Sequence, residues 1–258
     1  MSRLLIDTHT HYDNEAFEGD RDSLLPTLVS RGIAYVVNMG YDIESSKTSR
    51  DLAARYDFIW FAAGIHPHDA AGAPPDFEKA IAEILNDGKA VALGEIGLDY
   101  HYDYSPREKQ REVFARQISL AGGLGMPVVI HDRDAHADII DILSAHKDEL
   151  RGGVCHCFSG DRRLAGQALE LGLYIAFGGA LTFKNSREIA DAAAYTPSDR
   201  LLLETDCPYL SPAPYRGRRN DSTRLGIIAE RVAQIRGADV DEIAKITAEN
   251  AKKLFSIP

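Results

Sequence analysis

Eight apolar runs of strand length alternate with segments of helical periodicity, and this alternation constrains the fold more than any other feature of the sequence. The expected strands are residues 3–9, 34–40, 58–65, 90–96, 127–131, 152–158, 173–179 and 200–206. Two further helices are expected after the last strand, at residues 221–236 and 239–254. Eight βα units in 258 residues match an α/β fold, the (β/α)8 TIM barrel, which we expect to span residues 1–258 as a single domain. A doubly wound open sheet has the same alternation and is the alternative.

The composition excludes several classes of protein. No stretch approaches the roughly 20 apolar residues of a membrane span, and the first ten residues do not resemble a signal peptide. Three cysteines are too few for a disulfide framework, so we expect a cytoplasmic protein. The net charge of -10 argues against a broad basic surface for duplex nucleic acid, although it permits a short basic cleft. No protein partner is inferred.

Side chains that commonly bind metals stand at the carboxyl ends of five expected strands. In a (β/α)8 barrel this end carries the functional site, because the βα loops meet there. The residues are His9, His11, Glu95, His131, His156 and Asp206. One such residue alone is more often a satisfied polar side chain or a helix cap than a ligand. Together, at one rim, they indicate a metal site built from nitrogen and oxygen donors.

The spacing of His9 and His11 suits a shared cation, because alternate residues of a strand project to the same side. Asp7 is in phase with them and either joins the site or orients His9. Four imidazoles and two carboxylates exceed the ligand set of one tetrahedral ion, which favours two divalent ions bridged by Glu95. Imidazole-rich sites suit Zn2+, Mn2+, Fe2+ or Ni2+, whereas Mg2+ prefers oxygen.

Eight motifs along the chain point to one family. They are IDTHTHYD, AAGIHPH, LGEIGLDY, PVVIHDRDA, CHCFSG, TFKN, LETDCPYL and RGRRN. With these motifs in order, the sequence resembles the TatD family of metal-dependent hydrolases over nearly its whole length. The resemblance implies a barrel of the metallo-dependent hydrolase type and divalent-metal-dependent hydrolysis of DNA with exonuclease character. The metal ligands of the family correspond to the six residues at the strand ends.

On this basis the expected reaction is phosphodiester hydrolysis by two divalent ions, Mg2+ or Mn2+ in activity, at the ends of DNA, 3′ to 5′ on single strands. One ion is expected mainly at His9, His11 and Asp206, and the other mainly at His131 and His156, with Glu95 as the bridge.

Asp206, Glu95 and His66 are the expected catalytic residues. Asp206 is expected to accept the proton of the attacking water, because a carboxylate at the ion can reach it. His66 either contacts the phosphate or assists proton transfer, and the alternative is an ordinary loop histidine before a proline.

Basic and amide side chains on the same loops are the expected substrate contacts. They are Arg133, Lys184, Arg216, Arg218 and Asn220. Charge runs in loops rich in proline and glycine are usually solvated. The location of these side chains beside the expected metal site favours bidentate contacts to phosphate.

Two other features have alternative interpretations. Tyr100, Tyr102 and Tyr104 either stack on splayed bases or pack beneath their loop, and packing is slightly favoured. Cys155 and Cys157 flank His156, and strand alternation is expected to turn both thiols toward the surrounding helices as small apolar fillers.

Ser222 stands where the family usually has a proline, which leaves the geometry of the substrate loop open. Two rival functions also remain open. One is ester or amide hydrolysis at the same metals, such as deacylation of a D-aminoacyl-tRNA, and the other is a non-catalytic metal-binding module.

Overall fold

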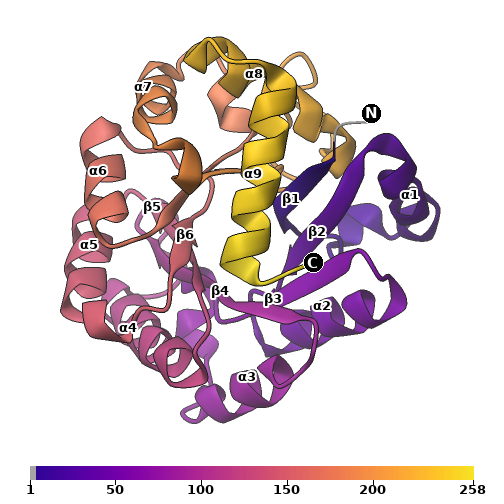
Figure 1. Ribbon diagram of the computed structural model, residues 1–258. Helices are drawn as coiled ribbons and strands as arrows, with labels where there is room; N and C mark the ends of the chain where they lie inside the picture. Colours follow the sequence, from indigo (N-terminus) through magenta and orange to yellow (C-terminus); the bar gives the residue numbers. More distant parts are fainter. Residues whose placement is uncertain (1–3) are drawn as a thin grey trace.

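The computed structural model describes residues 4–258, and its strands form one parallel sheet in the order β1 to β8 (Figure 1). The strands are β1 (Leu5–Thr10), β2 (Ile33–Met39), β3 (Ile59–Ala63), β4 (Ala90–Asp99), β5 (Val128–Arg133), β6 (Gly153–Cys155), β7 (Tyr174–Phe177) and β8 (Leu201–Leu203). The helices are α1 (Arg21–Leu28), α2 (Ile43–Arg55), α3 (Phe77–Leu85), α4 (Arg107–Leu124), α5 (His136–Ala145), α6 (Arg162–Glu170), α7 (Arg187–Tyr195), α8 (Leu225–Arg236) and α9 (Val240–Phe255). Arg3, predicted to begin the first strand, lies outside the described residues.

Hydrogen bonds between β1 and the segment after β8 close the sheet into a barrel. Thr10 and Cys207 form a parallel bridge. The N–H of Asp206 donates to the carbonyl of His9 at 3.0 Å, and the N–H of His11 donates to the carbonyl of Cys207 at 2.8 Å. An open sheet would leave both edge strands without these partners. The predicted (β/α)8 barrel is therefore confirmed, and the doubly wound alternative is wrong.

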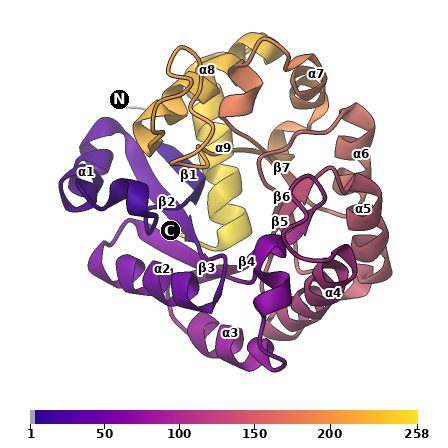
Figure 2. The ribbon, with the colours of Figure 1, turned by 180° about the vertical axis from the view of Figure 1, so that it is seen from behind.

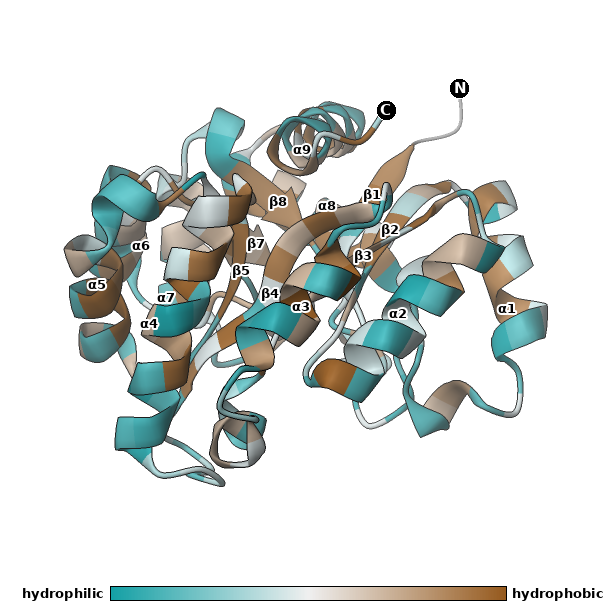
Figure 3. Cartoon of the chain, turned by 90° about the horizontal axis from the view of Figure 1, so that it is seen from below, coloured by the Kyte–Doolittle hydropathy of each residue, from teal (hydrophilic) through white to brown (hydrophobic). Residues whose placement is uncertain are grey.

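The helices surround the barrel and turn their apolar faces toward the strands (Figure 3). In α3 the buried residues Phe77, Ile81 and Ile84 recur at helical spacing, which gives the helix one apolar side. Side-chain caps mark several helix starts, such as Asp42 at α2 and Asp161 at α6. None of the helices within residues 4–258 combines the length and apolar character of a membrane span.

The amino-terminal end of the barrel is filled with apolar side chains. Strand residues of the barrel interior pack there against Ala251, Phe255 and Ile257 in and after α9. This helix lies across that end of the barrel, in contact with β1 and β8 (Figures 1 and 2). Since α9 occupies this end, polar side chains that point inward from the strands gather at the carboxyl end, where the βα loops lie.

The strand boundaries differ from the prediction at four of the proposed ligands. β5 continues to Arg133, so His131 lies inside its strand. β6 ends at Cys155 and β8 at Leu203, so His156 and Asp206 lie on the loops that follow these strands. β4 continues to Asp99, and Glu95 therefore lies inside the strand and not at its end. Strand ends are set by hydrogen bonds to the neighbouring strands, which an apolar run does not specify.

Gly97 of β4 is expected to tolerate no side chain. Its φ is +143°, and a Cβ built there would lie 2.0 Å from the carbonyl oxygen of His131 on β5. Gly97→Ala should lower the free energy of unfolding by more than about 2 kcal/mol, because backbone strain adds to the clash. Urea denaturation followed by circular dichroism measures this change. Gly123→Ala in α4 is the control, since an added Cβ meets nothing within 4 Å there, and a similar loss in both variants would contradict the account.

Candidate metal centre

Glu95 lies at the middle of a group of buried histidines at the carboxyl end of the barrel. A bulge in β4 positions it: Leu93 pairs with Val128 and Ile96 pairs with Ile130, so β4 advances one residue more than β5. Such a bulge changes the direction in which a side chain points. The N–H of Glu95 donates to the carbonyl of Gly40, directly after β2, at 2.9 Å, which fixes the backbone that carries the carboxylate.

The two oxygens of Glu95 face different histidines. Oε1 lies 2.8 Å from Nδ1 of His131 and 2.8 Å from Nε2 of His156. Oε2 lies 3.2 Å from Nε2 of His9 and 3.6 Å from Nε2 of His11. Burial raises the pKa of Glu95, but the charges of the neighbouring histidines outweigh burial and bring the pKa well below its usual range. One ionised carboxylate thus connects two pairs of imidazoles.

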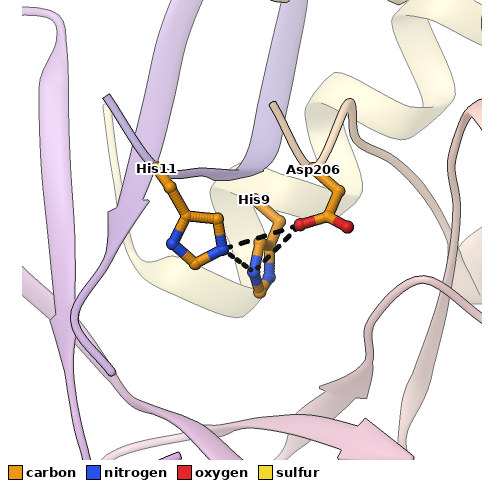
Figure 4. A group of neighbouring side chains, drawn as sticks. All are labelled: His9, His11 and Asp206. Carbon is orange, nitrogen blue, oxygen red and sulfur yellow. Dashed lines mark hydrogen bonds and ion pairs between the residues drawn. The ribbon is translucent and has the colours of Figure 1, made fainter. Parts of the chain in front are cut away.

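His9 on β1 and His11, directly after β1, converge with Asp206 from the loop after β8 (Figure 4). Nε2 of His9 lies 3.2 Å from Nε2 of His11. Oδ1 of Asp206 lies 3.5 Å from Nε2 of His11 and 3.8 Å from Nε2 of His9. Burial lowers the pKa of His11, but Asp206 and Glu95 raise it to about 9. Nitrogen and carboxylate atoms that converge in this way attract positive charge, which is the property of a cation site.

The donor atoms are close enough together to share ions. Among residues 4–258, three groups have ligand atoms that all lie within 4.8 Å of one another: His9, His11 and Asp206; His9, Glu95 and His156; His66, Glu95 and His131. Imidazole nitrogens and carboxylate oxygens suit divalent ions of the zinc, manganese and iron type. The six predicted ligands therefore lie in one cluster whose chemistry fits a divalent metal.

His66 lies next to this cluster but differs from the other histidines. Its Nδ1 accepts a hydrogen bond from the N–H of His68 at 3.1 Å, so in the neutral ring the proton is assigned to Nε2. Nε2 lies 3.5 Å from Oε1 of Glu95. Burial lowers the pKa of His66 to about 4. At neutral pH this ring is uncharged and presents an N–H donor at Nε2, which favours donating a hydrogen bond over metal ligation.

Asp99 is a buried carboxylate of the site that the sequence prediction does not include. Its Oδ2 lies 3.2 Å from Nε2 of His131 and 2.9 Å from Nε2 of His68. A carboxylate behind a metal-binding histidine fixes the orientation of the ring and increases its basicity. Strand alternation could have identified Asp99, because it lies four residues after Glu95 on the same strand.

Glu204 is a second carboxylate missing from the prediction. It is fully buried, and its Oε1 lies 3.4 Å from Nδ1 of His156. The same oxygen accepts a hydrogen bond from the N–H of Cys157 at 2.5 Å. Burial lowers the pKa of His156, but Glu95 and Glu204 together raise it well above its usual value. The position of Glu204, two residues before Asp206, is a sequence signal for a second acidic side chain at the site.

Asp7 fixes the loop after β8 instead of contacting His9. Its carboxylate accepts hydrogen bonds from the Thr205 N–H at 2.8 Å, the Thr205 hydroxyl at 2.6 Å and the Ser222 hydroxyl at 2.6 Å. Burial raises the pKa of Asp7 to about 7, against the effect of these hydrogen bonds. Ser222 also accepts a hydrogen bond from the hydroxyl of Tyr12 at 2.7 Å. The loop that carries Asp206 is therefore held by hydrogen bonds to Asp7, in which Ser222 takes part.

The two cysteines beside His156 have different surroundings. Cys155 lines a small cavity together with Ile139 of α5 and Leu164 of α6, as predicted for an apolar filler. Cys157 lies beyond the end of β6 and has a φ of +43°. The strand alternation on which its predicted direction rests therefore ends before this residue.

The donor cluster lies at the base of a cleft of about 890 Å3. Arg133 lines this cleft, as do Tyr102 and Tyr104. Both tyrosines are exposed, so the packing interpretation does not hold for them. It holds for Tyr100, which is half-buried and donates a hydrogen bond to Asp138 at 2.5 Å.

A second groove, of about 580 Å3, adjoins the cleft and shares Tyr209 and Leu210 with it. Arg216 and Arg218 line this groove and are exposed. Lys184 is exposed as well but lines neither the cleft nor the groove.

Asn220 is not available to substrate. It is fully buried, and its amide N–H groups donate to the carbonyls of Thr205 and Tyr209 at 2.8 Å each. The prediction that Asn220 binds substrate is corrected accordingly: it fixes the loop between β8 and α8. A short amide in a proline-containing loop satisfies backbone groups as readily as a ligand, and sequence alone does not separate the two roles.

Comparison with known proteins gives a consistent result. The family model of TatD related DNase matches residues 6–256. The metal-dependent hydrolase YabD of Bacillus subtilis is 39% identical over 254 residues, covering 98% of this chain and 100% of YabD. A protein of Citrobacter koseri named 3′-5′ ssDNA/RNA exonuclease TatD is 34% identical over 258 residues, covering 98% of this chain and 99% of that protein.

Solved structures agree with this match. The crystal structure of YjjV, a TatD homolog from Escherichia coli, has a TM-score of 0.94 and 30% sequence identity, and the match covers 100% of both chains. A TatD family hydrolase from Entamoeba histolytica has a TM-score of 0.89 at 21% identity and covers 99% of both chains, which shows the same fold.

Divalent metal binding is expected to depend on Glu95 directly and on Glu204 through His156. Glu95→Gln should abolish tight binding of Zn2+ or Mn2+, and Glu204→Gln should weaken it by about 10- to 100-fold, as carboxylates behind ligating histidines do. Isothermal titration calorimetry of chelator-treated protein measures both affinities. Glu170→Gln, an exposed change in α6, is the control. An unchanged affinity in Glu204→Gln would show that Glu204 does not orient His156.

Proposed function

This chain belongs to the TatD family of metal-dependent hydrolases, and from that membership we propose that it is a nuclease that removes nucleotides from the 3′ ends of single-stranded DNA. The observation that carries the proposal is Glu95, whose two oxygens face separate pairs of histidines at the base of the cleft. A carboxylate shared in this way suits two neighbouring divalent ions, the arrangement of many phosphodiester-cleaving sites. The name of the Citrobacter koseri relative, a 3′-5′ ssDNA/RNA exonuclease, supports the substrate class.

Each ion has its own ligands in this proposal. His9, His11 and Asp206 would hold one ion, His131 and His156 would hold the other, and Glu95 would be shared between them. Two such ions, when bound, lower the pKa of water and neutralise charge on the phosphate, and Mg2+, Mn2+ or Zn2+ can serve in this role.

The protein side chains provide proton transfer and positioning. Burial raises the pKa of Asp206, but its hydrogen bond with His11 and the charges of the nearby histidines lower it overall. Asp206 is then ionised at neutral pH and accepts the proton of the attacking water. His66 donates a hydrogen bond from its Nε2–H to a phosphate oxygen and keeps the proton. Asp99 and Glu204 keep the rings of His131 and His156 oriented for catalysis.

The basic side chains around the cleft suit a short single strand. Arg133 is placed to contact the phosphate beside the metal centre, and Arg216 and Arg218 line the adjoining groove. Lys184 is a more distant contact in this proposal. A local basic path of this kind can attract a nucleic acid end to an acidic protein. Three free cysteines within the described residues agree with the reducing cytoplasm as the proposed location.

Asp206→Asn is expected to lower hydrolysis of a 3′-labelled single-stranded oligonucleotide by about 100-fold or more, because the proton acceptor is lost. Release of labelled mononucleotide with Mg2+ or Mn2+ measures the rate. Asp134→Asn is the control, since Asp134 is an exposed carboxylate that contacts His101 outside the metal centre. A D-aminoacyl-tRNA is tested in parallel. Cleavage of its ester without cleavage of the oligonucleotide would refute the nuclease proposal, and loss of neither activity in Asp206→Asn would remove Asp206 from the mechanism.

A further inference from the structure

Two exposed tyrosines stand at the rim of the cleft that contains the metal centre. Tyr102 is 45% exposed and Tyr104 is 68% exposed. Their rings are stacked, with centroids 5.3 Å apart and an angle of 15° between the planes. Both side chains line the same cleft as Glu95, His131 and the other clustered donors. Exposure of large aromatic rings to water is unfavourable in free energy, because their apolar surface is not buried. A stacked and exposed pair at a functional cleft therefore suggests a binding role.

The side chains around the pair leave the outer ring accessible. The ring centroid of His68 lies 5.6 Å from that of Tyr102 and 4.8 Å from that of Tyr104, with planes nearly perpendicular to both. Because His68 is almost equally distant from the two parallel rings, it lies beside the stack and not over its outer face. The guanidinium of Arg133 lies over Tyr102, 4.7 Å from the ring centroid. Tyr104 is therefore the ring that a further planar group would meet.

The loop that carries the pair is held firmly in place. Oδ1 of Asp99 accepts hydrogen bonds from the N–H of His101 at 3.0 Å and of Tyr102 at 2.9 Å. Arg107 forms an ion pair with Asp103 at 2.7 Å. The hydroxyl of Ser105 donates to the carbonyl of His68 at 2.8 Å. A loop fixed in this way presents its aromatic rings without an ordering cost at the moment of binding.

The same carboxylate connects the tyrosine pair to the metal centre. While Oδ1 of Asp99 holds the loop backbone, its Oδ2 contacts Nε2 of His131 at 3.2 Å and Nε2 of His68 at 2.9 Å. The position of the rings is thus coupled to the position of a proposed metal ligand. A planar group on Tyr104 and a phosphate at the metal centre would lie in one cleft at a fixed separation.

We propose that the Tyr102–Tyr104 stack is a nucleobase platform, on which the base next to the scissile phosphate stacks against Tyr104. This inference rests on the proposed nuclease function and adds a specificity determinant to it. Stacking on an aromatic ring tolerates every base, because each base has a π-face. A base paired within a duplex is already stacked and cannot reach the ring, so the platform selects unpaired strands. Arg133 supports Tyr102 and supplies positive charge beside the phosphate.

The test compares an oligonucleotide that carries all its bases with one whose 3′-terminal nucleotides are abasic. The unsubstituted chain should cleave the complete strand with kcat/KM at least about tenfold higher, as expected for one stacked base. Tyr104→Ala should lose this preference, chiefly through KM, and cleave the abasic strand as before. Tyr104→Phe should retain the preference because the ring is kept. Tyr195→Ala is the matched control: Tyr195 is 41% exposed, Arg162 lies over its ring at 4.4 Å, and it is in α7 away from the cleft.

A second measurement does not depend on turnover. A single-stranded oligonucleotide with 2-aminopurine at its 3′ end should lose fluorescence on binding to the Asp206→Asn variant, since stacking quenches this base. The quenching should disappear when Tyr104→Ala is added. Equal kcat/KM of the unsubstituted chain on complete and abasic strands would overturn the platform. An equal loss of kcat/KM on both strands in Tyr104→Ala would also overturn it. Either result would leave the nuclease proposal intact. Failure of the unsubstituted chain to cleave any oligonucleotide would overturn the nuclease proposal, and absence of quenching would then overturn the platform also.

Discussion

A carboxylate buried inside a barrel is stable only where positive charge or hydrogen bonds surround it, and the carboxylate of Glu95 meets this requirement through the histidines around it. Its position depends on a bulge in β4 and on the backbone hydrogen bond to Gly40. The histidines come from strands that lie on both sides of β4 in the closed barrel. The geometry of the site is therefore a property of the whole sheet, and movement of any of these strands relative to the others would separate the donors.

The order of the strands was accessible from the sequence because each β-strand is a short apolar run and each helix has its own period. The exact strand ends were not accessible in the same way. Glu95 lies within its strand because β4 continues to Asp99, whereas His156 and Asp206 lie beyond β6 and β8. These ends depend on which backbone groups of neighbouring strands find partners. The predicted ligands nevertheless come together, because a loop residue that immediately follows a strand remains at the same rim of the barrel.

Prediction of individual roles was less complete, and particular residues show why. Asp99 and Glu204 were overlooked since a carboxylate behind a histidine has no motif of its own, although its period-two spacing from a predicted ligand is visible. Asn220 lies in a loop that contains three prolines, where a substrate contact and a backbone contact look alike in sequence; only its burial and its two hydrogen bonds distinguish them. The exposure of Tyr102 and Tyr104 likewise depends on the conformation of their loop. That conformation is fixed in part by contacts with residues distant in sequence.

Side-chain hydrogen bonds of Ser222 connect β1 and the residues after it to the loop that follows β8. Its hydroxyl donates to Asp7 and accepts from Tyr12, while its own N–H donates to the hydroxyl of Tyr12 at 2.9 Å. A proline at this position could provide neither the hydroxyl nor the N–H. The position of Ser222 is thus fixed by contacts with Asp7 of β1 and with Tyr12, which follows β1. Positions 7, 12 and 222 are therefore expected to be energetically coupled, so that the effect on stability of changing one of these residues depends on which residues stand at the other two.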